Sequence, residues 1–594
     1  MSKRLSIISM ILCASLGCVH QPKANKASSG LEIRTYPPGG PSINRKDYIA
    51  KSSKAMVTAA HPLASQAGQK VLKNGGNAVD AAVAVSFVIS VVRPQSTGIG
   101  GGGFLIHHSK DGRVRSFDFR EKAPLTASRD MYLDSKGQPK EFSYKGQSVP
   151  RASVNGHLSA GVPGLVAGLW DIHQKLGKMP WAQLLDDAIK IAEEGFPVYP
   201  NLAKAIQRRA KVMKVFDSTR DIYFPKGRAL ATGDLLVQKD LAVTLKAIAS
   251  QGKKAFYSGS IAKKIVAEMK AHKGLISFQD LKKYETVERN PVTGSYAGHK
   301  IYSMPPPSSG GIHIVQMLNV LENFPQNKLK FFSPDYLHAL VETMRQAYAD
   351  RAVHLGDPDY YKVPQKALTS QEYAKSIFSR LDLKKAGDSE KIGPSDLTPY
   401  EPPSTTHFSV VDSEGQAVSS TQTVNYTFGS GVVVPDTGIL LNDEMDDFSI
   451  KPATPNAFGL IGFEANKIEA GKRMLSSMSP TIVTKDDKVV AVLGSPGGSR
   501  IINATLQVIL NRLRFNLSPE DSVHAFRIHH QWRPDQIYHE INALIPETEQ
   551  ELTSRGFKLK SSSWPIGDVQ AIFRDGDQWI GVSDTRSDGR PVGL

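Results

Sequence analysis

The chain has 594 residues, of which 40% are hydrophobic and 22% charged, and it carries a formal net charge of +16. This composition is ordinary for a globular protein and excludes a disordered or fibrous one. The Lys and Arg residues are scattered, and no zinc-finger, helix-turn-helix or aromatic RNA-binding signature accompanies them, so no nucleic acid is expected as a partner.

The first residues have the pattern of an export signal. A short basic start precedes an apolar run at residues 5–16, which is too short to span a bilayer. Gly17 precedes Cys18 as in a bacterial lipoprotein cleavage site, although Ser15 stands where that pattern has Leu. We expect residues 1–18 to be a signal peptide, either of the lipoprotein type with lipid on Cys18 or of the plain cleaved type. Both alternatives place the protein in the periplasm or cell envelope, and the first adds a membrane anchor.

Cys13 and Cys18 are the only cysteines, and both lie in this leader. The body after it therefore has no disulfide, no thiol nucleophile and no cysteine-based metal site. Residues 19–44 are rich in Lys, Ser, Gly and Pro, and they are expected to form a linker.

The body begins with helical patterns. Apolar spacing predicts helices over residues 62–72 and 78–92, and the second is apolar nearly all round, which indicates burial. Asp80 and the short length of this second segment argue against a membrane span. Amphipathic spacing predicts three further helices, at residues 181–194, 336–355 and 371–381.

The pattern changes after about residue 404. Residues 387–404 are polar and contain four prolines, which indicates an exposed loop. Alternating residues then predict two strands, 407–412 and 416–424, joined by a turn at 413–415. Four further strands are expected, at residues 481–483, 489–493, 569–573 and 579–582. The C-terminal part therefore has the pattern of antiparallel sheet.

A hydroxyl nucleophile needs a base, and the usual arrangements are missing. The sequence has no convincing Gly-x-Ser-x-Gly elbow and no His/Glu metal motif on a helix, and the adjacent His529 and His530 would point in different directions. A threonine at a new N-terminus can use its own α-amine, whose unperturbed pKa is about 7.7 to 8.0. Thr405 lies where the polar loop enters a predicted strand, which suits this chemistry but also an ordinary turn and cap.

Residues 405–412 resemble the start of the small subunit of γ-glutamyltransferases, also called glutathione hydrolases, in the N-terminal nucleophile hydrolase superfamily. The resemblance covers nearly the whole chain after the linker. Its motifs are found at residues 75–82, 100–103, 118–121, 161–164, 304–311, 349–351, 442–448, 475–480, 494–500 and 529–532.

The resemblance implies an α+β fold, the four-layer αββα sandwich, built from the two subunits of one self-cleaved precursor. Residues 45–404 would form the large subunit, mostly helical by pattern, and residues 405–594 the small catalytic subunit. In the family, the nucleophile attacks the preceding carbonyl, here that of Ser404, so the chain would be cut between Ser404 and Thr405.

The same resemblance assigns the catalytic roles. Thr405 matches the nucleophile, and Thr423 matches a second threonine that hydrogen-bonds near it. Gly497 and Gly498 match the glycines whose N–H groups form the oxyanion hole, where glycine permits close approach and unusual dihedral angles. A Gly-rich turn is the plainer interpretation of this segment, and a phosphate loop is disfavoured because the P-loop Lys is missing.

A γ-glutamyl group carries an α-carboxylate and an α-ammonium, so its site should offer both signs of charge. Arg120 matches the carboxylate-binding arginine, whose planar guanidinium suits bidentate capture. Ser476 and Ser477 match hydroxyls that bind the same carboxylate. Glu444 and Asp447 match the residues that hold the ammonium.

One departure from the family lies in the lid. Residues 451–463 align with the loop over the pocket, where many bacterial members have a tyrosine whose hydroxyl bonds the counterpart of Asn425, itself a substrate contact. This chain has Phe458, which cannot form that bond. We expect a looser lid that admits water and favours hydrolysis over transfer.

The activity implied is transfer of the γ-glutamyl group of glutathione or related compounds to water, an amino acid or a dipeptide, without metal or organic cofactor. Two alternatives remain at this stage. An acylase for β-lactam side chains would share the nucleophile, but a hydrophobic acyl pocket would not need the opposite charges of Arg120 and Asp447. A surface lipoprotein that only binds would not need Thr405, Thr423 and the glycine pair.

Overall fold

The computed structural model describes residues 25–26, 32–37, 44–325, 327–391 and 405–594. The expected signal peptide with Cys18, most of the linker and the Ser404 side of the expected cleavage point lie outside the described residues.

Two seven-stranded antiparallel sheets form the centre of the molecule. The first sheet contains, in spatial order, β11 (Val287–Arg289), β6 (Val114–Phe119), β5 (Gly102–His108), β15 (Ala417–Thr423), β14 (Thr406–Val411), β4 (Met56–Ala59) and β25 (Arg590–Gly593). The second contains β12 (Val292–Tyr296), β13 (His299–Ser303), β18 (Thr481–Lys485), β19 (Lys488–Gly494), β23 (Gln570–Asp575), β24 (Gln578–Ser583) and β3 (Ile49–Ser52).

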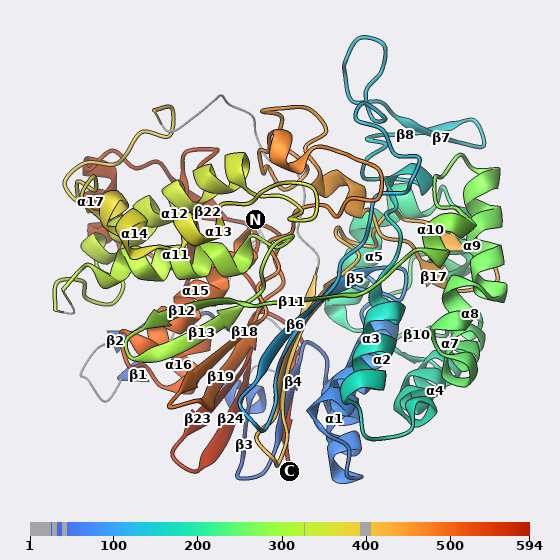
Figure 1. Ribbon diagram of the computed structural model, residues 1–594, viewed down its shortest axis with the longest axis horizontal. Helices are drawn as coiled ribbons and strands as arrows, with labels where there is room; N and C mark the ends of the chain where they lie inside the picture. The colour runs from blue at the N-terminus through green and yellow to red at the C-terminus, as the bar shows by residue number, and fades with distance from the viewer. Residues whose placement is uncertain (1–24, 27–31, 38–43, 326, 392–404) are drawn as a thin grey trace, which may run out of the picture.

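The two sheets pack face to face, and helices cover both outer faces (Figure 1). Apolar side chains fill the space between the sheets, among them Met56, Val411, Val492 and Ile572. The first sheet is covered by α1 (Pro62–Lys73), α2 (Ala78–Val92) and α3 (Leu165–Leu176), and the second by α11 (Gly310–Glu322), α15 (Arg500–Leu513) and α16 (Pro519–His524). The expected four-layer αββα sandwich is therefore confirmed.

Further helices extend the outer layers. The first layer continues with α4 (Asp186–Glu194), α5 (Pro200–Met213), α6 (Asp217–Tyr223), α7 (Lys239–Gln251), α8 (Lys253–Tyr257), α9 (Ser260–Ala271) and α10 (Phe278–Lys282). The second continues with α12 (Pro334–His354), α13 (Gln365–Leu368), α14 (Gln371–Phe378) and α17 (Pro546–Ser554). The part before Thr405 thus holds most of these helices, but it also supplies strands to both sheets.

The α2 helix lies against the first sheet, and all of its residues are buried. Its apolar character on every side explains this position, because α1, α3 and α4 enclose the faces that the sheet does not. Asn77 caps its N-terminus in a capping box with Asp80, so the buried carboxylate satisfies backbone N–H groups.

The predicted elements agree with the structure to within a few residues, with one exception. Residues 181–194 form a 3-10 turn (Trp181–Leu185) followed by α4, instead of one continuous helix. No helix within the described residues combines the length and apolar character needed to cross a membrane.

Candidate functional site

The β14–β15 hairpin brings the two threonines together. The register pairs Thr406 with Gln422, which places Thr405 opposite Thr423 at the open end of the hairpin. Their hydroxyl oxygens lie 3.3 Å apart, and both residues are buried. The Thr423 hydroxyl oxygen also accepts the backbone N–H of Asn425 at 2.7 Å, which fixes its position.

The glycine run at residues 100–103 lets the neighbouring backbone approach this hairpin. A Cβ atom on Gly101 would lie 2.0 Å from the carbonyl oxygen of Thr423, and one on Gly100 would lie 2.2 Å from that of Leu440. Both distances are far below van der Waals contact, so any side chain here would push the Thr423 segment away.

The loop between β19 and α15 supplies the two glycines. Gly497 has a φ of 137° and Gly498 a φ of 55°, in the region that favours glycine. Gly498 lines the same cavity as Thr405 and Thr423, and Gly497 borders a second cavity that also includes Thr405. Among the described residues, neither N–H group has a protein acceptor. Both donors therefore remain available to an oxyanion formed next to Thr405.

Opposite charges meet at the other end of this cavity. Arg120 follows β6, and its guanidinium forms ion pairs with Glu444 and, at 2.5 Å, with Asp447. The two acids sit on one 3-10 turn, Glu444–Asp447. Burial opposes the charge on Arg120, but attraction to Glu444 and Asp447 outweighs it and raises the pKa of the guanidinium. Burial also raises the pKa of Asp447, to about 6, against the opposing effect of Arg120.

Asn442 fixes the backbone before this acidic turn. Its side-chain amide donates to the carbonyl oxygens of Gly100 and Gly161, both at 2.8 Å. Its carbonyl oxygen accepts the N–H groups of Gly161 and Glu444. One side chain therefore ties the glycine run, the loop before α3 and the acidic turn together.

Ser476 and Ser477 line the same cavity as Arg120. The segment carrying them is held by the 304–311 motif, in which Pro307 accepts the N–H of Ser476 and Ser309 donates to the Ser476 carbonyl. The serines lie beside the guanidinium because these backbone bonds fix the chain there.

Arg351, on α12, also lines the cavity, although the sequence motifs assign it no role. Its guanidinium donates to the hydroxyl oxygens of Ser309 at 3.1 Å and Ser477 at 3.3 Å. Burial lowers the pKa of Arg351 to about 10, and attraction to Asp447 opposes this effect. Its sequence signal is its place in the 349–351 motif, to which the resemblance attaches no role.

Glu121 is a second residue that sequence reasoning passed over. Its carboxylate lies 3.6 Å from the Arg120 guanidinium and is fully buried. Neither of its oxygens has a hydrogen-bond partner among the described residues. Burial raises the pKa of Glu121 to about 7, although Arg120 lowers it. The carboxyl group thus lies beside the guanidinium without lining the cavity.

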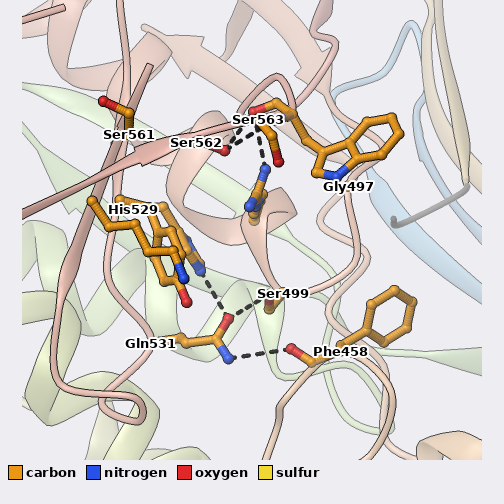
Figure 2. Close-up of a pocket in the computed structure, with 12 residues that line it drawn as sticks. Phe458, Gly497, Ser499, His529, Gln531, Ser561, Ser562 and Ser563 are labelled. Atoms are coloured by element: carbon orange, nitrogen blue, oxygen red, sulfur yellow. Dashed lines mark hydrogen bonds between the residues drawn. The ribbon is translucent and has the colours of Figure 1, made fainter. Parts of the chain in front are cut away.

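Phe458 lines both this cavity and a neighbouring one, whose lining residues are drawn in Figure 2. Its ring packs on that of Tyr426, with the centroids 4.3 Å apart. Gln531 donates to the Phe458 carbonyl at 3.2 Å and accepts from the Ser499 hydroxyl, which links the lid to the start of α15. Asn425 lines the cavity beneath, and its amide donates to the Asp443 carbonyl at 3.1 Å.

The neighbouring cavity has a volume of about 180 Å³, against about 20 Å³ for the space around Thr405. Gly497 and Phe458 belong to its wall, as do Arg500 and Lys560, while none of its lining residues is an acid. The ion pairs of Arg120 with Glu444 and Asp447 lie at the wall of the small space around Thr405. A bound zwitterion would replace these pairs with its own charges.

The structure therefore brings every predicted site residue within the described part of the chain to one place. Gly497 lies at its edge and the others line the cavity. The arrangement offers a hydroxyl, two backbone donors and both signs of charge, which is what acyl transfer from an amino-acid amide requires.

Comparisons with known proteins agree with this geometry. A family model described as gamma-glutamyltranspeptidase matches residues 64–594. The glutathione hydrolase proenzyme of Escherichia coli (strain K12) is 43% identical over 587 residues, which cover 98% of this chain and 97% of its own.

Solved structures share the fold. Cephalosporin acylase from Bacillus halodurans superposes with a TM-score of 0.82 at 28% identity, covering 94% of this chain and 99% of its own. The gamma-glutamyltranspeptidase of Helicobacter pylori gives a TM-score of 0.51 at 44% identity, covering 57% of this chain and 92% of its own. The chain belongs to the gamma-glutamyltranspeptidase family.

Proposed function

We propose that this protein cleaves the γ-glutamyl amide of glutathione and related compounds and passes the γ-glutamyl group to water or to an amine. The observation that carries the proposal is a single cavity that joins the Thr405–Thr423 hydroxyl pair to the buried charges of Arg120 and Asp447. The family membership and the glutathione hydrolase relative support the same activity.

In the proposed mechanism, the Thr405 hydroxyl attacks the γ-carbonyl carbon and its proton moves to the α-amine of the same residue. The N–H groups of Gly497 and Gly498 stabilise the oxyanion, and each such donor contributes roughly 3 kcal/mol. The protonated amine then gives its proton to the leaving nitrogen, and a γ-glutamyl ester remains on Thr405. Water or an acceptor amine resolves the ester by the reverse sequence.

Substrate charges direct the γ-carbonyl to Thr405. Arg120, Ser476 and Ser477 would bind the α-carboxylate, and Glu444 and Asp447 the α-ammonium. An acylase substrate without these charges could not replace the ion pairs of Arg120 with Glu444 and Asp447, so it would gain no binding from them. The cations Arg500 and Lys560 in the neighbouring cavity suit an acceptor amino acid or dipeptide, whose carboxylate they would attract.

The α-amine of Thr405 exists only after the chain is cut before it. The proposed cut starts when the Thr405 hydroxyl attacks the Ser404 carbonyl and the peptide bond rearranges to an ester. Hydrolysis of that ester leaves two fragments, residues up to 404 and residues 405–594. We further propose export to the cell envelope by the N-terminal signal, with Cys18 as the lipid-bearing residue. Fatty-acid labelling that persists in Cys18→Ala would exclude this anchor.

A γ-glutamyl anilide that releases a coloured amine tests the proposal, assayed with and without glycylglycine. The wild type should release the amine, and glycylglycine should increase the rate if transfer occurs. Thr405→Ala should remain one chain and lose at least about 1,000-fold in rate, since a nucleophile is removed. Thr405→Ser keeps a hydroxyl and should be cut and retain activity.

The likeness to a cephalosporin acylase favours one second candidate, hydrolysis of a β-lactam side-chain amide. A properly cut wild-type protein that ignores the γ-glutamyl anilide but hydrolyses such an amide would replace the first proposal with the second.

A further inference from the structure

A cluster of two histidines and a glutamate lies in the outer helix layer, and none of its members lines the Thr405 cavity. His157 belongs to a 3-10 turn, His157–Ser159. Glu268 is in the last turn of α9, and His272 caps that helix one turn later. Figure 1 shows α9 at the edge of the molecule, on the far side of the first sheet from α11 and α12.

The three side chains converge on one point. A ligand atom of each lies within 4.8 Å of the others. The Nε2 atom of His157 is 2.7 Å from Oε1 of Glu268, and the Nε2 atom of His272 is 3.7 Å from the same oxygen. Ligands of a tetrahedral ion at about 2.0 to 2.2 Å would be separated by similar distances. Small side-chain movements would therefore place all three around a single ion.

The backbone fixes the position of His157. Gly156 has a φ of 85°, and a Cβ atom there would lie 2.3 Å from the ring of Phe142. The N–H of Gly156 donates to the Ser430 carbonyl. Gly274 packs against His157 after α9, where a Cβ atom would lie 3.1 Å from that of the histidine. The turn and the helix end are thus held together without much freedom.

Aromatic rings enclose the cluster on the inner side. Tyr144 stacks on His157 with the planes 12° apart, and it also lies against His272, with the centroids 4.7 Å apart. His157 is fully buried, whereas the side chains of Glu268 and His272 are 13% and 22% exposed. An ion could enter from the solvent side, and the fourth position would remain open to water.

The chemistry of the donors selects a class of ion. Two imidazole nitrogens and one carboxylate suit zinc and similar transition metals, while magnesium and calcium prefer oxygen ligands alone. The Nδ1 atom of His157 has no hydrogen-bond partner in the described part of the chain, so the polar contact of this ring there is the one between Nε2 and Glu268.

We propose that His157, Glu268 and His272 form a binding site for a divalent transition metal of the zinc class, separate from the Thr405 centre. The ion would link the 157–159 turn to the end of α9 and stabilise this outer layer. It would take no part in acyl transfer.

The experiment uses the mature, untagged enzyme after treatment with a chelator. Zinc is titrated by calorimetry, and cobalt is added separately because its visible spectrum reports tetrahedral coordination. The wild type should bind one zinc per mature enzyme of two fragments and gain thermal stability with it. His272→Ala should bind at least about 100-fold more weakly, since losing a residue that merely orients a ligand already costs 10- to 100-fold in metal affinity.

Two further variants make the result decisive. Glu268→Gln keeps a hydrogen-bond partner for His157 but loses the charged ligand, so it should lose zinc affinity while remaining folded. His299→Ala removes a partly exposed histidine from the other half of the molecule and should bind zinc like the wild type. Both should retain γ-glutamyl anilide activity, which shows that they are folded. Equal zinc affinity in wild type, His272→Ala and Glu268→Gln, or no binding by the wild type, would overturn the proposal.

Discussion

At the scale of single residues, the charges at the Thr405 cavity are two arginines and three acids. The cavity is lined by Arg120, Arg351, Glu444 and Asp447, and the buried Glu121 lies 3.6 Å from Arg120 outside that lining. A buried charge without a partner costs free energy, so the acid in excess of the two arginines should be protonated and neutral. Burial raises the pKa of Glu121, to about 7, and it also raises the pKa of Glu444. A proton held by these carboxyl groups would balance the two arginines before any substrate arrives.

Arg351 is the residue whose role can be tested most directly. Arg351→Ala should raise the KM for a γ-glutamyl donor about tenfold and change kcat little, because hydrogen bonds from a charged group contribute about 1.5 to 3 kcal/mol. Its guanidinium orients Ser477 toward the carboxylate end of the cavity. The KM of Arg351→Lys should lie between those of the wild type and Arg351→Ala. An ammonium group cannot donate to both Ser309 and Ser477 with the fork geometry of a guanidinium.

Steady-state kinetics gives KM and kcat for each variant. Thermal unfolding of the same variants shows whether the substitution has changed their stability. Arg345→Lys changes another buried arginine of α12 that does not line the cavity, and it controls for lost packing. An unchanged KM with a lower kcat in Arg351→Ala would contradict a role in donor binding.

At the scale of elements, the sequence predicts local structure better than function. Alternation alone predicts β14 and β15, and apolar spacing predicts α1 and α2. The pattern cannot show that the hairpin carrying Thr405 and Thr423 lies next to residues 100–103. That contact joins segments about three hundred residues apart. Only the resemblance to a family links them beforehand. Arg351 and Glu121 lie in the 349–351 and 118–121 motifs, but neither pattern nor resemblance assigns them a role, because their contacts with distant segments show only in the folded structure.

The lid loop, residues 451–463, contains Phe458, at which we expect this chain to differ from many bacterial members of the family. Phe458 packs on Tyr426, and Gln531 holds its carbonyl, so the ring covers the cavity without a hydroxyl to bond Asn425. Phe458→Tyr should raise the ratio of transfer to hydrolysis about fivefold, the equivalent of one hydrogen bond of about 1 kcal/mol. A firmer lid would exclude water more completely.

Product analysis at fixed glycylglycine, with free glutamate and γ-glutamyl-glycylglycine counted separately, gives this ratio. Phe463→Tyr adds a hydroxyl in the same loop outside the cavity and serves as the matched control. If Phe458→Tyr and Phe463→Tyr both give the wild-type ratio of transfer to hydrolysis, a hydroxyl at the lid does not control whether water or an amine resolves the ester.

At the scale of the whole molecule, the order of strands is the feature that no local pattern contains. The first sheet alternates segments from both sides of Thr405. β14 and β15 lie between β5 and β4, and the C-terminal β25 pairs with β4. In the second sheet, β13 pairs with β18, and β3 pairs with β24. Such pairings join residues hundreds of positions apart, so they depend on the complete fold.

This interleaving predicts that cutting before Thr405 leaves the two fragments together. Separating them would break strand pairs in both sheets and expose the core between them, where each large apolar side chain contributes about 1.5 to 3 kcal/mol. The mature wild type and the uncut Thr405→Ala variant should therefore elute from size exclusion at the same volume, even in 1 M salt, since the association is chiefly apolar. Denaturing mass spectrometry should find two chains in the first and one in the second. If the two fragments of the wild type separate under native conditions, the strand pairs between them are not sufficient to keep the fragments together.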